Sequence, residues 1–139
     1  MKRSLTITCA LVGAMTLAAP LAATAASKHA AKAKPEAALP DLSQEQLDNA
    51  GRVLVGKIDC EFNQSVDISE SAAKKGYFVV AFKGKKYTLA PEATTTGAVR
   101  LEDKKAGVVW LQIGNKSMLM NAKAGQRMVD NCVHPTQKS

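Results

Sequence analysis

Histidine and aromatic residues are scarce in this sequence, and their scarcity excludes several classes of function. The chain has 2 His among 139 residues, and aromatic residues make up 4%. His134 is the one histidine of the expected folded part, and no P-loop, dinucleotide fingerprint, GxSxG or HExxH motif is present. The adjacent Glu102 and Asp103 point to opposite faces of a strand and cannot flank one substrate bond. We therefore expect neither an enzyme nor a bound cofactor.

Acidic residues are fewer than basic ones, which narrows the choice of partners. The formal net charge is +7, and the segment from Arg52 to Pro135 contains 13 Lys or Arg and 8 Asp or Glu. A basic surface can attract nucleic acid, anionic lipid or acidic glycan. Here the lysines are scattered, mostly over turns, and aromatic residues that stack on bases are few. We expect a solvated basic surface and no nucleic-acid partner.

Only one long apolar run is present, and its position indicates export. Met1 to Arg3 form a positive segment, Leu5 to about Ala19 an uncharged apolar one, and Ala23-Thr24-Ala25 has the small residues that signal peptidase requires. A membrane anchor is disfavoured, because the run is shorter than the ~20 residues that cross a bilayer and is interrupted by Pro20. We expect a signal peptide at residues 1–25, no membrane span, and a periplasmic or secreted mature protein.

Cysteine is rare as well. Of 3 Cys, Cys9 lies within the signal peptide, where almost no apolar segment precedes it, so lipidation is disfavoured. Cys60 and Cys132 remain as an even pair in an oxidising compartment, which favours a disulfide between the first and last strands. Only His134 lies near either of them, whereas a metal site needs three or four ligands. We expect no metal site.

Residues 26–51 are expected to form a disordered spacer and a short helix. Ser27 to Pro40 contains Ala, Lys and Pro without periodic hydrophobic residues. Ser43 then fits a helix N-cap, Gln46 occupies the capping-box position, and Gly51 marks a stop.

From residue 52 to 139 the pattern changes to short strands of alternating character, separated by turn residues. This regular spacing predicts an all-β barrel or sandwich. The expected strands are Val53–Glu61, Gln64–Ile68, Tyr77–Lys83, Lys86–Ala90, Ala98–Glu102, Val108–Ile113, Ser117–Asn121 and Arg127–Val133.

The strand Val108–Ile113 is expected to be central. Two-residue periodicity sends Val109 to one face and Trp110, the only Trp of the chain, to the other. Since neither face is fully polar, we expect both to be covered and Trp110 to be a core residue.

Several short motifs occur in an order that resembles a known family. Cys60 lies in the first strand, Lys85-Lys86-Tyr87-Thr88-Leu89 forms a KxYxL strand, and Thr96-Gly97-Ala98-Val99-Arg100 follows a Pro-containing loop. With the export signal, the Trp110 strand and the final Cys132, the chain resembles the MliC-like bacterial inhibitors of c-type lysozyme over about Lys57 to Cys132. The resemblance implies a small eight-stranded antiparallel barrel, in agreement with the strand count.

The resemblance also implies an inhibitory site. In that family a Ser before the Gly-Ala strand and a Lys after the aromatic strand bond to the two catalytic carboxylates of lysozyme. Here Thr96 precedes Gly97 and keeps the hydroxyl, whereas Ile113 stands at the Lys position and the nearest cation is Lys116, beside Ser117. We therefore expect Thr96, Gly97, Lys116 and Ser117 to contact a lysozyme.

A second class of function stays open. The protein is then a non-inhibitory envelope module that binds an anionic envelope component, or a small ligand between Trp110 and the strand of Met118 and Met120. The basic charge favours this alternative, because animal lysozymes are themselves cationic and like charges slow their encounter.

Overall fold

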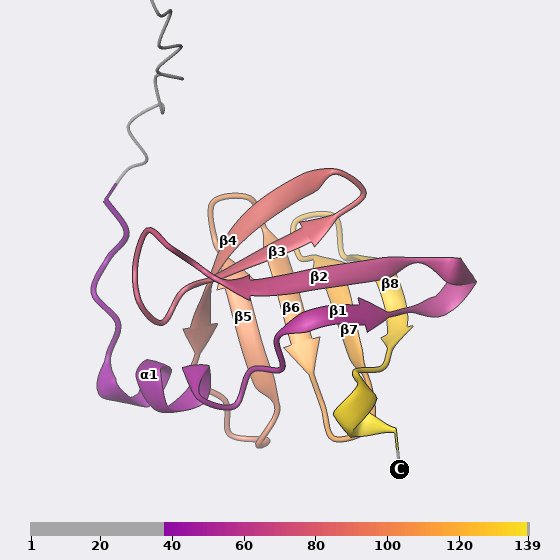
Figure 1. Ribbon diagram of the computed structural model, residues 1–139. Coiled ribbons are helices and arrows are strands. Elements are labelled where there is room, and N and C mark those ends of the chain that lie inside the picture. Colours follow the sequence, from indigo (N-terminus) through magenta and orange to yellow (C-terminus); the bar gives the residue numbers. More distant parts are fainter. Residues whose placement is uncertain (1–37, 139) are drawn as a thin grey trace, which may run out of the picture. The chain divides into compact units, whose positions relative to one another are not determined.

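The computed structural model describes residues 38–138, which form an eight-stranded antiparallel, nearly closed barrel with one short helix (Figure 1). The elements are α1 (Gln44–Ala50), β1 (Gly56–Asp59), η1 (Glu61–Asn63), β2 (Ser65–Glu70), β3 (Phe78–Phe82), β4 (Lys85–Glu92), β5 (Val99–Asp103), β6 (Val108–Gln112), β7 (Ser117–Asn121), β8 (Gln126–Cys132) and η2 (Pro135–Gln137). The expected fold class is confirmed. The expected signal peptide and nearly all of the spacer lie outside the described residues.

Each strand pairs with the next one along the chain, from β1 to β8. Figure 1 shows β1, β2 and β3 lying across β5 to β8, with β4 passing from one group to the other. Accordingly, β4 pairs with β3 up to Leu89 and with β5 from Ala90 onward. The strand β4 continues through Pro91 to Glu92, two residues beyond its predicted end at Ala90. Proline is tolerated there because the pairing of β4 with β3 ends at Leu89, so the missing N–H of Pro91 removes no hydrogen bond to β3.

The start of β1 also differs from the prediction. Residues 53–55 were expected to belong to this strand, but β1 begins at Gly56. The N–H of Leu54 donates instead to the side-chain Oε1 of Gln112, at 2.9 Å. A side chain distant in sequence thus replaces a strand partner.

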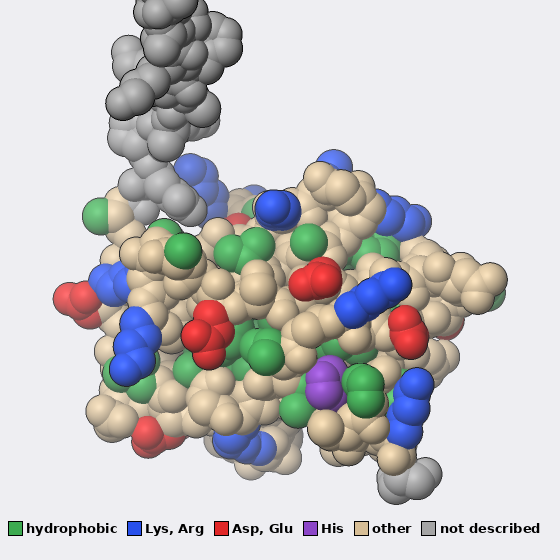
Figure 2. All heavy atoms as spheres, in the orientation of Figure 1, with side chains coloured by type: hydrophobic (Ala, Val, Ile, Leu, Met, Phe, Trp, Pro, Cys, Tyr) green, Lys and Arg blue, Asp and Glu red, His purple; other side chains and the backbone are tan. Residues whose placement is uncertain are grey.

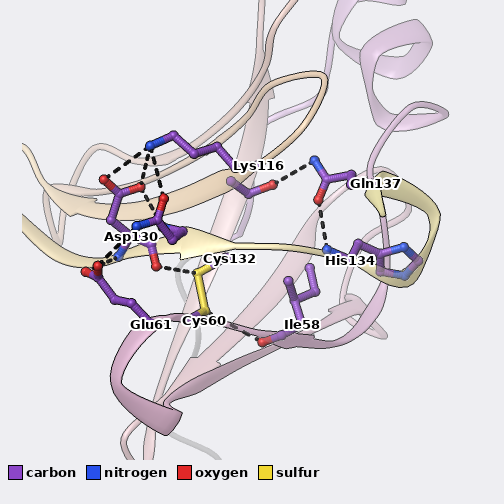
Figure 3. The surroundings of a disulfide bond; sticks show 10 residues. Ile58, Cys60, Glu61, Lys116, Asp130, Cys132, His134 and Gln137 are labelled. Carbon is purple, nitrogen blue, oxygen red and sulfur yellow. Dashed lines mark hydrogen bonds and ion pairs between the residues drawn. A yellow bond between two sulfur atoms is a disulfide. The ribbon is translucent and has the colours of Figure 1, made fainter. Parts of the chain in front are cut away.

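The first and last strands meet at a seam that differs from the other junctions. One isolated bridge joins Asp59 to Val133, whose N–H donates to the Asp59 carbonyl at 2.8 Å. Beside it, the expected disulfide joins Cys60 to Cys132 across 72 residues (Figure 3). The barrel is therefore closed covalently where its backbone ladder is shortest.

The barrel interior is filled by apolar side chains that alternate along the strands. Trp110 is fully buried and faces inward opposite Leu119, while Val109, on the outer face of β6, is only 2% exposed. Both faces of the central strand are covered, as expected. The core comprises Ile58, Val66, Ile68, Phe78, Val80, Phe82, Leu89, Val99, Leu101, Val108, Trp110, Leu119, Val129 and Cys132.

The helix α1 begins and ends where the sequence predicts. Ser43 is the N-cap with a complete capping box to Gln46, and Gly51 is the C-cap. Gln46 Nε2 donates to the Pro91 carbonyl at 2.7 Å and Asn49 Nδ2 to the Glu92 carbonyl at 3.3 Å. Two side-chain amides therefore dock the helix on the end of β4.

Gly76, in the β2–β3 loop, is required by the packing of the helix. Its φ is +89°, and a Cβ added there would lie 2.7 Å from Leu42 Cδ1 and 2.9 Å from Leu47 Cδ2. Both the backbone conformation and the close approach favour glycine.

The disulfide generates the first prediction. In the chain without residues 1–25, no thiol should react before reduction, since Cys60 and Cys132 are paired. Replacing both by Ala should lower the free energy of unfolding by about 2–4 kcal/mol, because the unfolded chain loses a long closed loop. Thiol titration and urea denaturation measure the two effects, and two reactive thiols in the native protein would contradict the pairing.

Trp110 generates the second prediction. Trp110→Ala should lower the free energy of unfolding by ~3–5 kcal/mol, because it leaves a large cavity in the core. Trp110→Phe should cost less, since within the described residues the buried indole N–H has no hydrogen-bond acceptor to lose. Denaturation measures both free energies of unfolding. If Trp110→Phe and Trp110→Ala lower this free energy equally, the indole N–H donates a hydrogen bond in the native protein.

Candidate functional site

The two loops singled out by the sequence meet at one end of the barrel. Val99, at the start of β5, pairs with Gln112 at the end of β6, which brings together the β4–β5 loop and the β6–β7 turn. A groove of about 470 Å³ opens there. Its lining residues are Leu54, Thr96, Gly97, Ala98, Val99, Gln112, Ile113, Gly114, Thr136 and Gln137.

The groove carries no charge of its own. Among the described residues that line it, none is Asp, Glu, Lys or Arg. The apolar side chains of Leu54 and Ile113 contribute to its lining, and the hydroxyls of Thr96 and Thr136 and two glutamine amides provide polar contacts. Such a lining suits an apolar group flanked by hydrogen-bonding atoms.

Gln112 holds the N-terminal wall of the groove. Its Oε1 accepts from the Leu54 N–H and its Nε2 donates to the Arg52 carbonyl, both at 2.9 Å. One amide thereby satisfies a donor and an acceptor of a segment that has no strand partner there.

Gln137, in η2, holds the C-terminal wall. Its Nε2 donates to the Ile113 carbonyl at 2.8 Å, and its Oε1 accepts from the His134 N–H at 2.9 Å. His134 Nε2 lies 3.1 Å from the Val55 carbonyl, so the one histidine of the described residues links the start of η2 to the segment between α1 and β1. It serves as a structural bridge in this arrangement.

Thr96 and Gly97 lie exposed at the rim of the groove. Gly97 has a φ of +76°, a conformation that glycine adopts readily. Its carbonyl accepts a short hydrogen bond from the guanidinium of Arg52, which is also exposed. A hydroxyl and a permanent cation therefore lie in the same small region of the rim.

Lys116 and Ser117 are placed differently from Thr96. The Lys116 ammonium lies 3.2 Å from a carboxylate oxygen of Asp130 and 3.4 Å from Asn131 Oδ1 (Figure 3). Ser117 is fully buried, and its hydroxyl lies 3.4 Å from Gln137 Nε2. Ile113 and Gly114, rather than these two residues, bring the β6–β7 turn to the groove.

The sequence pattern could have predicted the burial of Ser117, but no pattern predicts the contact that Arg52 makes. Ser117 and Leu119 are two residues apart on one strand, so they share the inward face. The Arg52 contact with Gly97 spans 45 residues and arises only from the closure of the fold.

The carboxylate of Asp130 is buried among donors at the seam. The Asn131 N–H, at 2.6 Å, is the main reason that the pKa of Asp130 lies below its usual value, and Lys116 contributes in the same direction, opposed by burial. Arg127 Nη1 adds a second ion pair at 3.0 Å. The nearby Glu61 carboxylate accepts from the Asp130 N–H at 3.1 Å, so this cluster connects β8 to the β1–β2 turn.

Trp110 and the methionines of β7 lie on opposite faces of the sheet. Trp110 faces the interior opposite Leu119, whereas Met118 and Met120 alternate with Leu119 and face outward. The sheet separates them, so no small-ligand site lies between them in this structure.

Comparisons with known proteins give no relative for this chain: no protein-family model, no curated protein and no solved structure matches it. Residues 38–138 contain no helix with the length and hydrophobicity that crossing a membrane requires. The same part of the chain has no group of three or more His, Cys, Asp or Glu side chains placed to hold a metal ion.

The Asp130 cluster generates the third prediction. Because the folded-state pKa of Asp130 is lowered, its charged form stabilises the fold above the unfolded pKa of about 4, and this contribution is lost as the pH falls further. Asp130→Asn should be less stable than the wild type at pH 7 and should lose less stability on acidification. Urea denaturation between about pH 7 and pH 3 measures both; parallel pH profiles would exclude Asp130 as a source of the acid sensitivity.

Proposed function

We propose that this protein is a periplasmic or secreted inhibitor of c-type lysozyme, which presents the Thr96 rim of the barrel to the acidic cleft of the enzyme. Two lines support the proposal: the resemblance of the motifs to the MliC-like family, and a barrel of the type that this resemblance implies. The proposal includes export, which the sequence indicates.

The observation that carries the proposal is the contact between Arg52 and Gly97. It holds a guanidinium at Gly97, the residue that follows Thr96 on the exposed rim, although Ile113 stands at the position of the expected lysine. A guanidinium is always charged and pairs well with carboxylates. A neutral donor and a cation match a cleft that contains one protonated acid and one carboxylate.

Lys116 is less well placed than Arg52 for this role. Its side chain is only 32% exposed, and its ammonium already pairs with Asp130. To bind the enzyme it would have to leave a buried carboxylate, which costs free energy. We therefore assign the cationic contact to Arg52 and the hydroxyl contact to Thr96.

The fourth prediction tests this assignment through inhibition of an animal c-type lysozyme by the mature protein. Arg52→Ala should weaken inhibition by at least about tenfold, because a charged pair in a desolvated cleft is lost. Thr96→Ala should cost about 1 kcal/mol, since a neutral hydroxyl makes a weaker bond. Lys116→Ala should chiefly lower stability.

Two controls separate charge from position. Arg52→Lys keeps the charge and should retain part of the inhibition. Lys85→Ala removes one exposed positive charge at the start of β4, at the other end of the barrel, and should have no effect. If Arg52→Ala and Thr96→Ala inhibit as well as the wild type, the rim is not the site.

A second candidate, binding of an anionic envelope polymer, is favoured by the β3–β4 turn. Lys83 in this turn and Lys85 and Lys86 at the start of β4 are all exposed, and none forms an ion pair within residues 38–138. Figure 2, by contrast, shows basic side chains spread over one face with acidic ones between them. A wild type that does not inhibit lysozyme, but binds an anionic polysaccharide through these three lysines in a salt-dependent manner, would establish this alternative.

A further inference from the structure

Three hairpin turns lie at the end of the barrel opposite the groove. They are the β3–β4 turn at residues 83–84, the β5–β6 turn at residues 104–107 and the β7–β8 turn at residues 122–125. Figure 1 shows all three on its upper side. The β4–β5 loop and the β6–β7 turn, which border the groove, lie at the other end because consecutive strands are antiparallel. Turns that are distant in sequence therefore form one surface of the protein.

This end of the barrel carries exposed lysines from all three turns. Figure 2 shows basic side chains along the upper edge of the molecule, where Figure 1 places these turns. Lys104 pairs with Glu92 at 3.1 Å, and the others form no ion pair within residues 38–138. The exposed lysines without an ion pair, in the turns and at the start of β4, are Lys83, Lys85, Lys86, Lys105 and Lys123.

The β5–β6 and β7–β8 turns are fixed to each other. The Ala122 N–H donates to the Gly107 carbonyl at 2.7 Å, and the Lys123 ammonium donates to the Lys105 carbonyl at 2.5 Å. Gly107 has φ +72°, and a Cβ added there would lie 2.5 Å from Lys123 Cγ. Because glycine leaves room for the Lys123 side chain, the charge of one turn is held on the backbone of the other.

The remaining charges belong to the β3–β4 hairpin. Lys83 Nζ lies 5.3 Å from the centre of the Phe82 ring, which is itself only 5% exposed. Lys85 and Lys86 follow at the start of β4 and are both exposed. The nearest acidic side chain of the three turns, Asp103, accepts a hydrogen bond from the Ala106 N–H at 2.8 Å. The surface therefore has an excess of positive charge.

The same surface lacks the groups that lipid and nucleic acid require. In the described part of the chain, the exposed large hydrophobic side chains are Leu47, Val55 and Phe62, and all three lie outside these turns. Nothing at the turns can insert into a bilayer or stack on a base. A linear acidic polysaccharide needs neither contact, and it can bind lysines of several turns at once, which adds their weak individual attractions.

We propose that the end of the barrel formed by these three turns is a second interaction surface, which binds an acidic polysaccharide through lysines of all three turns. It extends beyond the β3–β4 hairpin, because Lys105 and Lys123 belong to it. It also leaves the groove free, so one molecule can hold the polymer at one end and a protein partner at the other.

The fifth prediction compares two triple variants of equal net charge, with polygalacturonate as the polymer. Neutralising one lysine of each turn, by Lys83→Gln, Lys105→Gln and Lys123→Gln, should weaken binding at least about tenfold at low ionic strength. The control neutralises three exposed lysines outside the turns and should weaken binding at most about threefold. Titration calorimetry measures both, and the control positions are Lys57, Lys75 and Lys138.

Three further measurements establish that charge at these turns is responsible. Replacing the same three turn lysines by Arg keeps the charges and should retain wild-type binding. Added salt should weaken binding by the wild type, and neutral dextran should not bind. The double variant Lys105→Gln with Lys123→Gln should bind more weakly than the wild type, because the surface includes the β5–β6 and β7–β8 turns.

Several results would overturn the proposal. Equal losses in the two triple variants would mean that net charge alone governs binding, and an unchanged double variant would reduce the site to the β3–β4 hairpin. Saturable binding to vesicles of equal parts phosphatidylcholine and phosphatidylglycerol, without binding to polygalacturonate, would make an anionic lipid surface the partner. A wild type that binds neither has no such surface.

The polymer surface and lysozyme inhibition are separable by mutation, because the turns and the groove lie at opposite ends. The triple variant of the turns should inhibit lysozyme as well as the wild type does. Arg52→Ala, which tests the inhibitory rim, should bind polygalacturonate at most about threefold more weakly than the wild type.

Discussion

The closure between β8 and β1 is the constraint on which the rest of the structure depends. Seven junctions of the barrel are ladders between consecutive strands, whereas this one has a single bridge and a disulfide. Unpaired strand edges expose backbone donors and acceptors, and closure removes most of that liability. A small domain with a modest core gains most from such a covalent link.

The seam also positions the groove that we associate with function. Residues directly after Cys132 form η2, whose Gln137 builds one wall of the groove. Residues directly after Cys60 form the β1–β2 turn. A single covalent link therefore supports both η2 and the β1–β2 turn.

Charge is separated from the groove by this architecture. Asp130 and its cations lie at the seam, and the groove itself is uncharged, so the cation that we propose for the lysozyme contact lies outside the groove lining. Arg52 lies at the rim because its carbonyl accepts a hydrogen bond from Gln112 and its guanidinium donates one to the Gly97 carbonyl. Two tertiary hydrogen bonds thus put a charge beside Thr96.

The sequence by itself determined the local features and the topology of neighbouring strands. The capping box at Ser43, the eight strands, the two-sided burial of Val108–Gln112 and the Cys60–Cys132 pair depend on periodicity, turn chemistry or residue counts that short windows contain. Only the tertiary structure decided which polar groups remain available for a partner. Arg52 reaches Gly97, Lys116 turns to Asp130, and Gln137 anchors the β6–β7 turn, because closing the barrel brings together segments 14 to 45 residues apart and polar groups then bond to whatever lies within reach.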